Sequence, residues 1–338
     1  MPKSVLSWLL KSQSEHAYFS EALKQAQYAY GSTHPNPSVG AIIEKDGQIV
    51  SRAYTQKVGG PHAEKLAIDQ ASISLEGASL YVTLEPCCHI GRTPPCTEAI
   101  INSGIKRVIY GALDPNPIVC GNGIKALTQA GLSVEQLTDQ DWLEQSQALI
   151  RPFASYILKQ RPYVIVKIAS SDDLKIARMG MRTKITGLDA DIVVHNMRRA
   201  LDAVMVGANT FRIDKPKLTA RLGDLRHGGQ PVRVVLGSEQ SFTGDLWQVS
   251  GRPKILAALE LLAERGITSV LVEPGARLFK SLMEENLADE IWWFRSKQTI
   301  GATGLGLAYA PTDLSKLGFA FSQEKTLGED ILGIWLKS

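Results

Sequence analysis

The sequence predicts an α/β protein of two domains, residues 1–150 and 151–338. A chain of 338 residues with 44% hydrophobic content is long enough to bury two cores of ordinary size. Segments with strand character alternate with helical segments along both halves, which favours sheets covered by helices on both faces. A polar, helical stretch between Trp142 and Pro162 separates the two series and places the boundary.

The first half contains the elements of one such sheet. Apolar residues recur at helical spacing over 16–31 and stop at Gly31. Residues 39–54 predict two strands around a turn at Asp46 and Gly47. The pattern continues with a helix over 64–72, a strand over 78–85, a helix from Cys96, a strand over 107–113, a helix over 123–131 and a short strand near Val134.

The second half repeats the alternation. Strands are predicted over 163–171, 202–211, 232–237, 269–275 and 289–294, and helices over 189–201, 255–266 and 278–287. The last strand, "DEIWWF", suits either a buried core strand or an apolar edge that pairs between two chains. The sequence contains no phosphate-binding P-loop and no Gly-x-Gly-x-x-Gly motif.

Charge and composition narrow the class of partner. The net charge is only +3, without a dense basic block, so nothing favours binding to nucleic acid. Residues 1–22 hold one apolar patch, too short to span a membrane and without a cleavage site, which predicts a cytoplasmic protein with no membrane partner. The four cysteines, Cys87, Cys88, Cys96 and Cys120, cluster in the first half. In a reducing compartment this clustering indicates metal binding or catalysis rather than disulfides.

Two short segments of the first half together predict a metal site, "GGPHAE" at 59–64 and "EPCCHIGRTPPC" at 85–96. His62, Cys87 and Cys96 supply one imidazole and two thiolates, a set suited to zinc, and leave a fourth position for water. Zinc lowers the pKa of bound water to about 7, and Glu64 is placed to shuttle protons between that water and a leaving amine. Taken singly, the histidine also suits a polar helix start and each cysteine a small buried side chain. Their combination favours the metal, whereas Cys88 and Cys120 are expected to be structural.

The spacing of these residues narrows the class of enzyme. His-x-Glu followed by Pro-Cys is typical of zinc deaminases that act on nucleobases, although here the second cysteine follows the first by nine residues instead of three. Together with "HPNPSVGAII" and "DPNPIVCGNG", these segments resemble the RibD family, the bifunctional deaminase-reductases of riboflavin biosynthesis. The resemblance covers most of residues 15–135.

The resemblance implies a cytidine-deaminase-like, three-layer α/β/α first domain in which the three candidate ligands bind Zn2+ and Glu64 is catalytic. It implies hydrolytic removal of an exocyclic amine from a phosphoribosylated diaminopyrimidine, with Asn36 and His89 contacting the pyrimidine. Thr55 stands where the family usually has His. We therefore expect substrate affinity or preference to differ from that of the family.

The second half resembles the reductase domain of the same family, which is similar in fold to dihydrofolate reductase and uses NADPH. The segments "VKIASSDD", "KITG", "VHNMRRALDAVMVGANTFRIDKPKLTAR" and "VLVEPGARL" carry this resemblance. It implies that five residues hold the phosphorylated substrate: Arg198, Asp214, Leu218, Arg221 and Glu273. It also implies cofactor-facing residues, Ser170, Thr210 and Gly275, and two further candidates near the reacting centre, Lys167 and Thr186.

Ordinary structural roles are also open for some of these residues. Arg198 lies on a predicted helix among other basic residues, where a solvated face explains it as well as a phosphate does. Asp214, beside Lys215 and Pro216, suits a turn. Glu273 is harder to explain structurally, because it ends an apolar strand, where ligands of α/β sheets gather.

The second half departs from the family pattern at Leu174, Lys184, Gly237 and Pro274. Only sixteen residues separate Ser238 from Ile255, where the family has a longer segment with an extra strand, so part of the NADPH site is expected to be missing. Two alternatives to a bifunctional enzyme stay open: a zinc deaminase with a degenerate, non-catalytic second half, and a deaminase of nucleic-acid bases, against which the low net charge counts. The family resemblance further implies a homo-oligomer, either a dimer or a tetramer.

Overall fold

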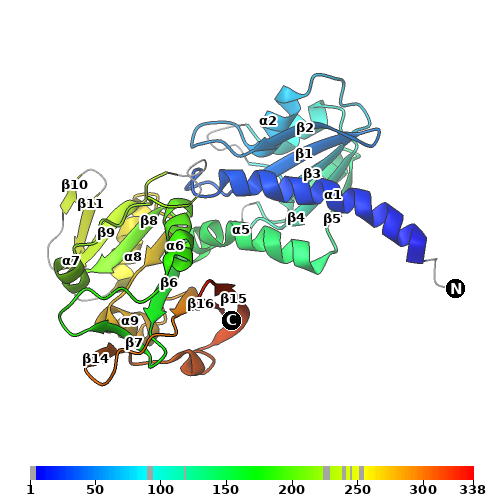
Figure 1. Cartoon of the computed structure of the whole chain (residues 1–338). Coiled ribbons are helices and arrows are strands. Elements are labelled where there is room, and N and C mark those ends of the chain that lie inside the picture. The colour runs from blue at the N-terminus through cyan, green and yellow to red at the C-terminus, as the bar shows by residue number, and fades with distance from the viewer. Residues whose placement is uncertain are drawn as a thin grey trace. The chain divides into compact units, whose positions relative to one another are not determined.

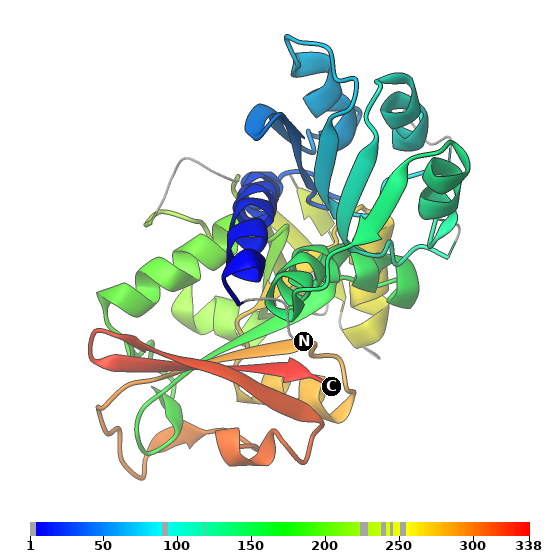
Figure 2. The ribbon, with the colours of Figure 1, turned by 90° about the vertical axis from the view of Figure 1, so that its right-hand side faces the viewer.

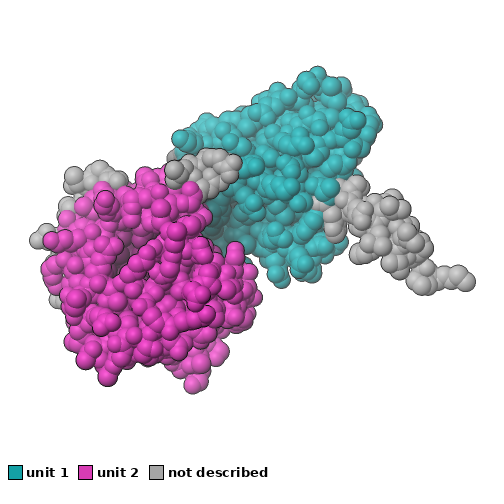
Figure 3. Space-filling model, in the orientation of Figure 1, with its two compact units in different colours: residues 1–159 teal, residues 160–338 magenta. Residues whose placement is uncertain are grey.

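The structure, a computed structural model, describes residues 5–89, 94–117, 119–223, 229–237, 241–243, 246–250 and 255–338. The chain divides into two compact units, residues 1–159 and 160–338, which Figure 3 colours separately. The boundary expected after residue 150 falls inside helix α5 (Gln140–Lys159), whereas the chain divides after the last residue of that helix. All of α5 belongs to unit 1, where it packs against helix α1 (Val5–Ala29) and strand β4 (Arg107–Ala112).

Unit 1 contains a five-stranded sheet in the order β2–β1–β3–β4–β5 (Figure 1). Its other strands are β1 (Gly40–Lys45), β2 (Gln48–Tyr54), β3 (Ser79–Leu84) and β5 (Ser133–Gln136). β1 runs antiparallel to both neighbours, whereas β3, β4 and β5 are parallel. The β1–β2 turn uses Asp46 and Gly47, both with positive φ (52° and 80°), which a two-residue hairpin of this hand requires.

Helices cover both faces of this sheet. On one face, Phe19 of α1 packs over Ile42 and Tyr81 in a cluster to which α5 also contributes. The strand residues that alternate with these, such as Ile43 and Leu80, enter a second cluster on the other face. That cluster is covered by three helices, α2 (Ala63–Gln70), α3 (Cys96–Asn102) and α4 (Asn122–Gln129). The three-layer α/β/α arrangement predicted for the first half is therefore confirmed.

Unit 2 contains a nine-stranded sheet in the order β10–β11–β9–β8–β12–β6–β13–β16–β15. The six neighbouring strands from β11 to β13 in that order are parallel, and each end of the sheet continues in antiparallel pairing. The strands are β6 (Tyr163–Ser170), β8 (Ala203–Gly207), β9 (Val232–Gly237), β10 (Ser241–Thr243), β11 (Leu246–Ser250), β12 (Ser269–Val272), β13 (Glu290–Arg295), β15 (Phe319–Leu327) and β16 (Asp330–Lys337). Two further strands, β7 (Lys175–Arg178) and β14 (Gly304–Gly306), form a small separate sheet. Figure 2 shows β15 and β16 as a long antiparallel pair at one edge.

The helices of unit 2 are α6 (Leu188–Ala200), α7 (Ala208–Asp214), α8 (Ile255–Glu264), α9 (Ala276–Glu284) and a short 3-10 turn, η1 (Pro311–Asp313). Leu259 of α8 and Phe279 of α9 join Val166 and Trp293 of the sheet in the largest apolar cluster of the unit. The alternate strand residues, such as Val204, are also buried, as expected of strands covered on both faces. Within the described ranges of both units, no helix has the length and apolar character needed to cross a bilayer.

Several elements of unit 2 differ from the sequence-based expectations. The "DEIWWF" segment forms β13 between β6 and β16, so of its two possible roles it is a core strand. The short segment before α8 nevertheless contains β11, which pairs in parallel with β9 where a missing strand was expected. The patterns did not predict β7, α7, β10 or the three strands after β13. The sequence pattern did not predict the long edge strand β15, because seven of its nine residues are exposed and the strand therefore lacks alternating apolar residues.

The parallel strands place several candidate residues at one edge of the sheet. Ser170 ends β6, Gly207 ends β8, Gly237 ends β9 and Glu273 directly follows β12. Because the carboxyl ends of neighbouring parallel strands meet at one edge, the candidate residues of the second half gather there.

One buried ion pair fixes the start of unit 2. The guanidinium of Arg161 donates to both carboxylate oxygens of Asp289, at 2.6 and 2.9 Å, and the two side chains are 8% and 3% exposed. We expect Asp289→Ala to lower the free energy of unfolding of unit 2 by about 3–5 kcal/mol, because it leaves a buried charge without this partner. Urea unfolding of the full chain followed by tryptophan fluorescence measures this, since four of the six tryptophans lie beyond residue 159. Glu329→Ala, which removes an exposed ion pair with Lys297, is the control and should cost about 0–1 kcal/mol; equal effects of the two variants would contradict the prediction.

Candidate functional site

Three side chains of unit 1 converge on one point. His62 directly precedes α2, Cys87 follows β3, and Cys96 is the first residue of α3. The Nδ1 atom of His62 lies 3.5 Å from the Sγ of Cys87 and 3.3 Å from the Sγ of Cys96, and ligand atoms of the three residues lie within 4.8 Å of one another. In a tetrahedral zinc site, metal–ligand bonds of about 2.0–2.3 Å separate neighbouring nitrogen and sulfur ligands by about 3.6 Å. The spacing therefore fits a single zinc ion.

Hydrogen bonds give one of the two cysteines thiolate character. The Cys96 thiol, by donating to the sulfur of Cys87, lowers the pKa of Cys87 to about 4. The backbone N–H of Cys96 donates to the same sulfur at 3.4 Å. The bond with Cys87 raises the pKa of His62, and the bond with Cys87 together with burial raises that of the Cys96 thiol. The three groups thus share protons, which metal binding releases from such ligands.

Glu64 lies beside this cluster in the first turn of α2 and is only 4% exposed. Burial, with the nearby negative charge of Cys87, raises the pKa of Glu64 to about 7. The carboxylate of Glu64 also interacts with the Cys96 thiol and helps to raise the pKa of that thiol. A carboxyl group with a pKa near neutrality both accepts and delivers protons at working pH. The geometry therefore provides a proton-transfer group next to the three potential ligands.

Sequence reasoning overlooked Glu85, a buried carboxylate that orders the loop behind the cluster. The carboxylate accepts four backbone N–H hydrogen bonds, from Asp114 at 3.3 Å, Gly121 at 3.0 Å, Gly123 at 3.1 Å and Ile124 at 3.4 Å. The chain can approach this closely because residue 123 is glycine, where a Cβ would lie 2.0 Å from the carbonyl oxygen of Pro86. Glu85 therefore ties the turn that carries Cys87 to the start of α4. Its one signal in the sequence was a carboxylate at the end of an apolar strand, directly before Pro-Cys.

We expect Glu85→Ala to speed amide hydrogen exchange across residues 113–124. Four buried or half-buried N–H groups lose their acceptor, which should lower the local opening free energy by at least about 2 kcal/mol. Hydrogen exchange detected by mass spectrometry of peptides from this segment measures the change. Glu98→Ala, on the exposed side of α3, is the matched control. Unchanged exchange in the Glu85 variant would show that water replaces the carboxylate without cost.

The candidate pyrimidine contacts are placed differently from one another. Asn36 is half-buried, and its backbone is held by Thr33, whose hydroxyl donates to the Asn36 carbonyl at 3.0 Å. His89 is exposed and precedes residues 90–93, which lie outside the described ranges. Thr55 is buried, and its hydroxyl bonds to the backbone of Val39 at 3.3 and 3.4 Å. This threonine therefore extends the pairing of β1 and β2 rather than presenting a polar group to solvent.

In unit 2, Arg198 of α6 meets Glu273 at the end of β12. Two parallel hydrogen bonds join them, from Nε to Oε1 at 2.7 Å and from Nη2 to Oε2 at 2.8 Å. The Arg198 side chain is only 11% exposed, so the alternative of a solvated helix face does not hold. Burial alone would raise the pKa of Glu273, but the charge and hydrogen bonds of Arg198, together with the charge of Lys167, outweigh it and hold that pKa below its usual value. Lys167, whose pKa burial lowers, lies close enough to interact with this carboxylate and over the ring of Phe294.

The other candidate substrate residues divide into two groups. Arg221 is exposed and donates to Thr219, at 2.7 Å to the hydroxyl and 3.3 Å to the carbonyl. Arg198 donates to the same carbonyl at 3.3 Å, so the structure brings the two arginines together. Leu218 is 1% exposed, with a positive φ of 55°, and its side chain therefore lies in the core. Asp214 ends α7, and burial raises its pKa against the opposing charge of Arg182.

The candidate cofactor residues lie at the carboxyl edge of the sheet. A Cβ on Gly275 would come within 2.9 Å of the Thr210 hydroxyl, and one on Gly237 within 3.1 Å of Ala208. Glycines therefore leave the backbone uncovered after β9 and after β12, the two strands that flank β8, and the second of these glycines caps the start of α9. Ser170 is fully buried and accepts a hydrogen bond from the indole of Trp293 at 2.9 Å. Thr186 is also buried, close before α6.

The departures from the family pattern have local explanations. Leu174 takes a positive φ of 58° in the turn where the family has glycine, so this chain bears the strain that glycine would avoid. Lys184 pairs with Asp191 of α6 at 3.1 Å and is largely exposed. Pro274 lies between Glu273 and the first residue of the α9 cap, where it offers no N–H.

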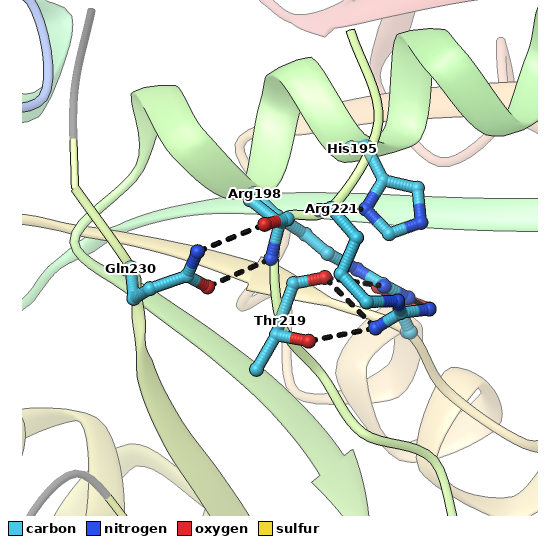
Figure 4. A network of polar contacts seen from close by, with 7 residues as sticks. His195, Arg198, Thr219, Arg221 and Gln230 are labelled. Carbon is cyan, nitrogen blue, oxygen red and sulfur yellow. Dashed lines mark hydrogen bonds and ion pairs between the residues drawn. The ribbon is translucent and has the colours of Figure 1, made fainter. Parts of the chain in front are cut away.

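Two polar residues near Arg221 were also missed from the sequence. His195 of α6 accepts the backbone N–H of Arg221 at 2.9 Å, and Gln230 makes two hydrogen bonds with the backbone of Ala220 (Figure 4). Neither residue carries a local sequence signal, because their partners lie 26 and 10 residues away.

Models of two known protein families match this chain. The model described as "RibD C-terminal domain" matches residues 162–332, which is about half of the chain. The model described as "Cytidine and deoxycytidylate deaminase zinc-binding region" matches residues 12–112, which include Glu64 and all three potential ligands, His62, Cys87 and Cys96.

Whole-length relatives are similar to both units together. A curated "Riboflavin biosynthesis protein RibD" from Aquifex aeolicus is 36% identical, covering 93% of this chain and 96% of the relative. The Escherichia coli protein of the same name is 32% identical, covering 93% of this chain and 97% of the relative. Among solved structures, a deaminase/reductase from Thermotoga maritima is 32% identical with a TM-score of 0.85, covering 97% of this chain and 100% of its own. A RibD from Acinetobacter baumannii is 29% identical, also with a TM-score of 0.85, covering 96% and 99%.

These similarities confirm the predicted fold of each unit and the predicted class of enzyme. The chain combines a zinc-binding deaminase domain with a reductase domain of the type that uses NADPH, and both serve riboflavin biosynthesis. At more than 30% identity over more than nine-tenths of its length, the chain belongs to the RibD family of riboflavin biosynthesis proteins.

Proposed function

We propose that this chain catalyses two successive steps of riboflavin biosynthesis. Unit 1 hydrolytically deaminates 2,5-diamino-6-(5-phosphoribosylamino)pyrimidin-4-one, and unit 2 then uses NADPH to reduce the ribosyl side chain of the product to ribityl. The Thermotoga maritima relative is named for a deaminase and a reductase acting on such compounds. The observation that carries the proposal is the convergence of His62, Cys87 and Cys96 on one point, with the buried carboxyl group of Glu64 beside them.

In the first step, the three converging side chains hold the zinc ion. Zinc bound there supplies a Lewis acid that makes water a nucleophile at neutral pH. Glu64 takes a proton from the attacking water and delivers one to the exocyclic nitrogen of the pyrimidine, which leaves as ammonia. Its pKa of about 7 suits both transfers. Asn36 and His89 hold the pyrimidine ring.

In the second step, Arg221 binds the phosphate of the substrate as a planar fork of donors. The Arg198–Glu273 pair lies beside it and contacts the sugar, and Asp214 and the backbone of Leu218 complete the substrate site. NADPH supplies the hydride. The chain holds NADPH along Gly275 and Thr210, with Ser170 below them. Lys167 and Thr186 are candidate residues near the reacting centre.

Turnover of the full chain with and without NADPH tests the two steps separately. We expect ammonia release in both cases and oxidation of NADPH only after deamination. Ammonia release without NADPH oxidation, together with no saturable NADPH binding, would refute the second step and favour a degenerate second half. NADPH oxidation with the pre-deaminated substrate but no ammonia release would refute the first step alone.

We further propose that the enzyme works in the cytoplasm as a homo-oligomer, a dimer or a tetramer, on a small molecule rather than on nucleic acid. The two thiol ligands support a cytoplasmic location, because a reducing compartment keeps them free of disulfides. Family resemblance is the support for assembly. Light scattering of the full chain at micromolar concentration tests the oligomer, and a mass equal to one chain would refute it.

A further inference from the structure

The segment Leu218–Arg221 has an unusual set of backbone partners. It belongs to no helix or strand, yet side chains from elsewhere in unit 2 bind its backbone polar groups. Figure 4 shows this network, in which His195 of α6 and Gln230, which lies just before β9, both approach the segment. An irregular segment held in this way keeps one conformation without the support of a sheet or helix.

Gln230 binds Ala220 as a neighbouring strand would. Its side-chain oxygen accepts the N–H of Ala220 at 2.9 Å, and its side-chain nitrogen donates to the carbonyl of Ala220 at 2.8 Å. Two antiparallel hydrogen bonds from one planar amide fix both the position and the rotation of this peptide group. Only an amide side chain supplies a donor and an acceptor at this spacing.

His195 holds the next residue. Its Nδ1 accepts the backbone N–H of Arg221 at 2.9 Å, and the ring is 6% exposed. An Nδ1 that accepts a hydrogen bond carries no proton, so the imidazole is neutral and protonated at Nε2. Burial and the two neighbouring arginines lower its pKa, which is consistent with the neutral form.

The residue that this network holds is Arg221, whose positive charge an anionic ligand would neutralise. Arg198 and Arg221 both donate to the carbonyl oxygen of Thr219, each at 3.3 Å. Glu273 neutralises Arg198 through both carboxylate oxygens. In the part of unit 2 that the structure describes, the side chain of Arg221 is exposed and donates only to the neutral oxygens of Thr219. An exposed, unneutralised guanidinium beside a neutralised one suits a phosphate ester.

We propose that His195 and Gln230 are positioning residues of the reductase unit, which hold the backbone of residues 219–221 so that Arg221 is aimed at the phosphate of the substrate. The inference rests on the proposed second step and on its assignment of Arg221. It adds two residues that touch neither substrate nor cofactor and that act through the backbone of their neighbours. Because they fix direction rather than supply charge, their loss should weaken binding of the phosphorylated substrate more than it slows the chemical step.

The first test compares Gln230→Ala and His195→Leu in the full chain. We expect each variant to raise the KM of the reductase step for the phosphorylated substrate about tenfold, the usual cost of one such hydrogen bond, with kcat changed less than about threefold. With the corresponding nucleoside, which lacks the phosphate, KM should stay near the wild-type value. His195→Asn should restore most of the loss, because its amide oxygen lies near the position of Nδ1. Gln323→Ala, on exposed β15, is the control.

The second test separates positioning from general stability. In an Arg221→Gln background, His195→Leu should have no further effect on KM, because the cation that it aims is already gone. The same loss in both backgrounds, an equal loss for the nucleoside and the phosphorylated substrate, or a fall in kcat at constant KM would each overturn the proposal. Zinc content and ammonia release report on folding of unit 1, and the urea midpoint reports on unit 2.

The outcome also distinguishes this inference from the proposed function. If the wild-type chain fails to oxidise NADPH, the second step is refuted. Calorimetric affinities of the phosphorylated pyrimidine and its nucleoside for the same variants then decide the positioning role without turnover. Wild-type affinities that do not differ between the two ligands would show that Arg221 meets no phosphate, and the inference would fail.

Discussion

Glu64→Gln is expected to slow ammonia release about 10²- to 10⁴-fold while one zinc ion stays bound per chain. The substitution keeps the size of the side chain and removes its ability to take up and deliver a proton. The carboxyl group is buried against the cluster, and its pKa of about 7 leaves both protonation states populated at neutral pH. The variant should therefore lose the proton transfers without losing the metal. Zinc analysis of the purified protein, beside an ammonia assay, measures the two effects independently.

Glu98→Gln is the matched control for this prediction. Glu98 also lies in the first turn of a helix next to the cluster, but its side chain is exposed. It should leave both zinc content and ammonia release unchanged. If Glu64→Gln instead retains more than about a tenth of the wild-type rate, another group moves the protons and the assigned role is wrong. NADPH oxidation with the pre-deaminated substrate should be unaffected by either variant.

The metal cluster could be predicted from the sequence because each ligand lies at an end of a secondary-structure element. His62 precedes a helix and Cys96 begins one, while Cys87 is the third residue after the end of a buried strand. Strands and helices of this α/β pattern bring such ends to the same side of a sheet. A short motif with the right residue types therefore sufficed to predict three side chains that the fold brings within 4.8 Å.

The supporting polar contacts could not be predicted in the same way. Glu85 binds the backbone of residues that follow it by 29 to 39 positions. Which N–H groups reach its carboxylate depends on how that loop folds back towards the end of β3. His195 and Gln230 likewise bind backbone groups, which any residue type supplies. A side chain that recognises backbone leaves no partner residue to find in the sequence. Such contacts become visible only once the fold is known.

The arginine–carboxylate pair of unit 2 shows an intermediate case. Family resemblance indicated Arg198 and Glu273 as separate substrate contacts, and the structure joins them in a bidentate ion pair. Glu273 thus neutralises Arg198, whereas Arg221 donates to the neutral oxygens of Thr219. Sequence alone could not show which of the two arginines keeps an unneutralised charge, because this depends on which one a buried carboxylate contacts in the fold.

Cys96→Ser is expected to lower the affinity for zinc by more than about 100-fold and to abolish ammonia release. Serine is nearly isosteric, but its hydroxyl stays protonated at neutral pH and is a poor zinc ligand. The loss should be larger than that of a supporting residue, because the substitution removes a sulfur that is itself one of the three potential ligand atoms. Competition with a chromophoric chelator measures the affinity.

Cys120→Ser is the control for this substitution, since Cys120 is a free and exposed thiol outside the cluster. It should bind one zinc ion and release ammonia at the wild-type rate. The reductase step assayed with the pre-deaminated substrate should survive in the Cys96 variant, because unit 2 has its own sheet and core. Wild-type zinc affinity in Cys96→Ser would mean that the zinc ion is bound by other ligands. In that case a cluster of one imidazole and two thiolates could not be the centre at which water attacks the pyrimidine.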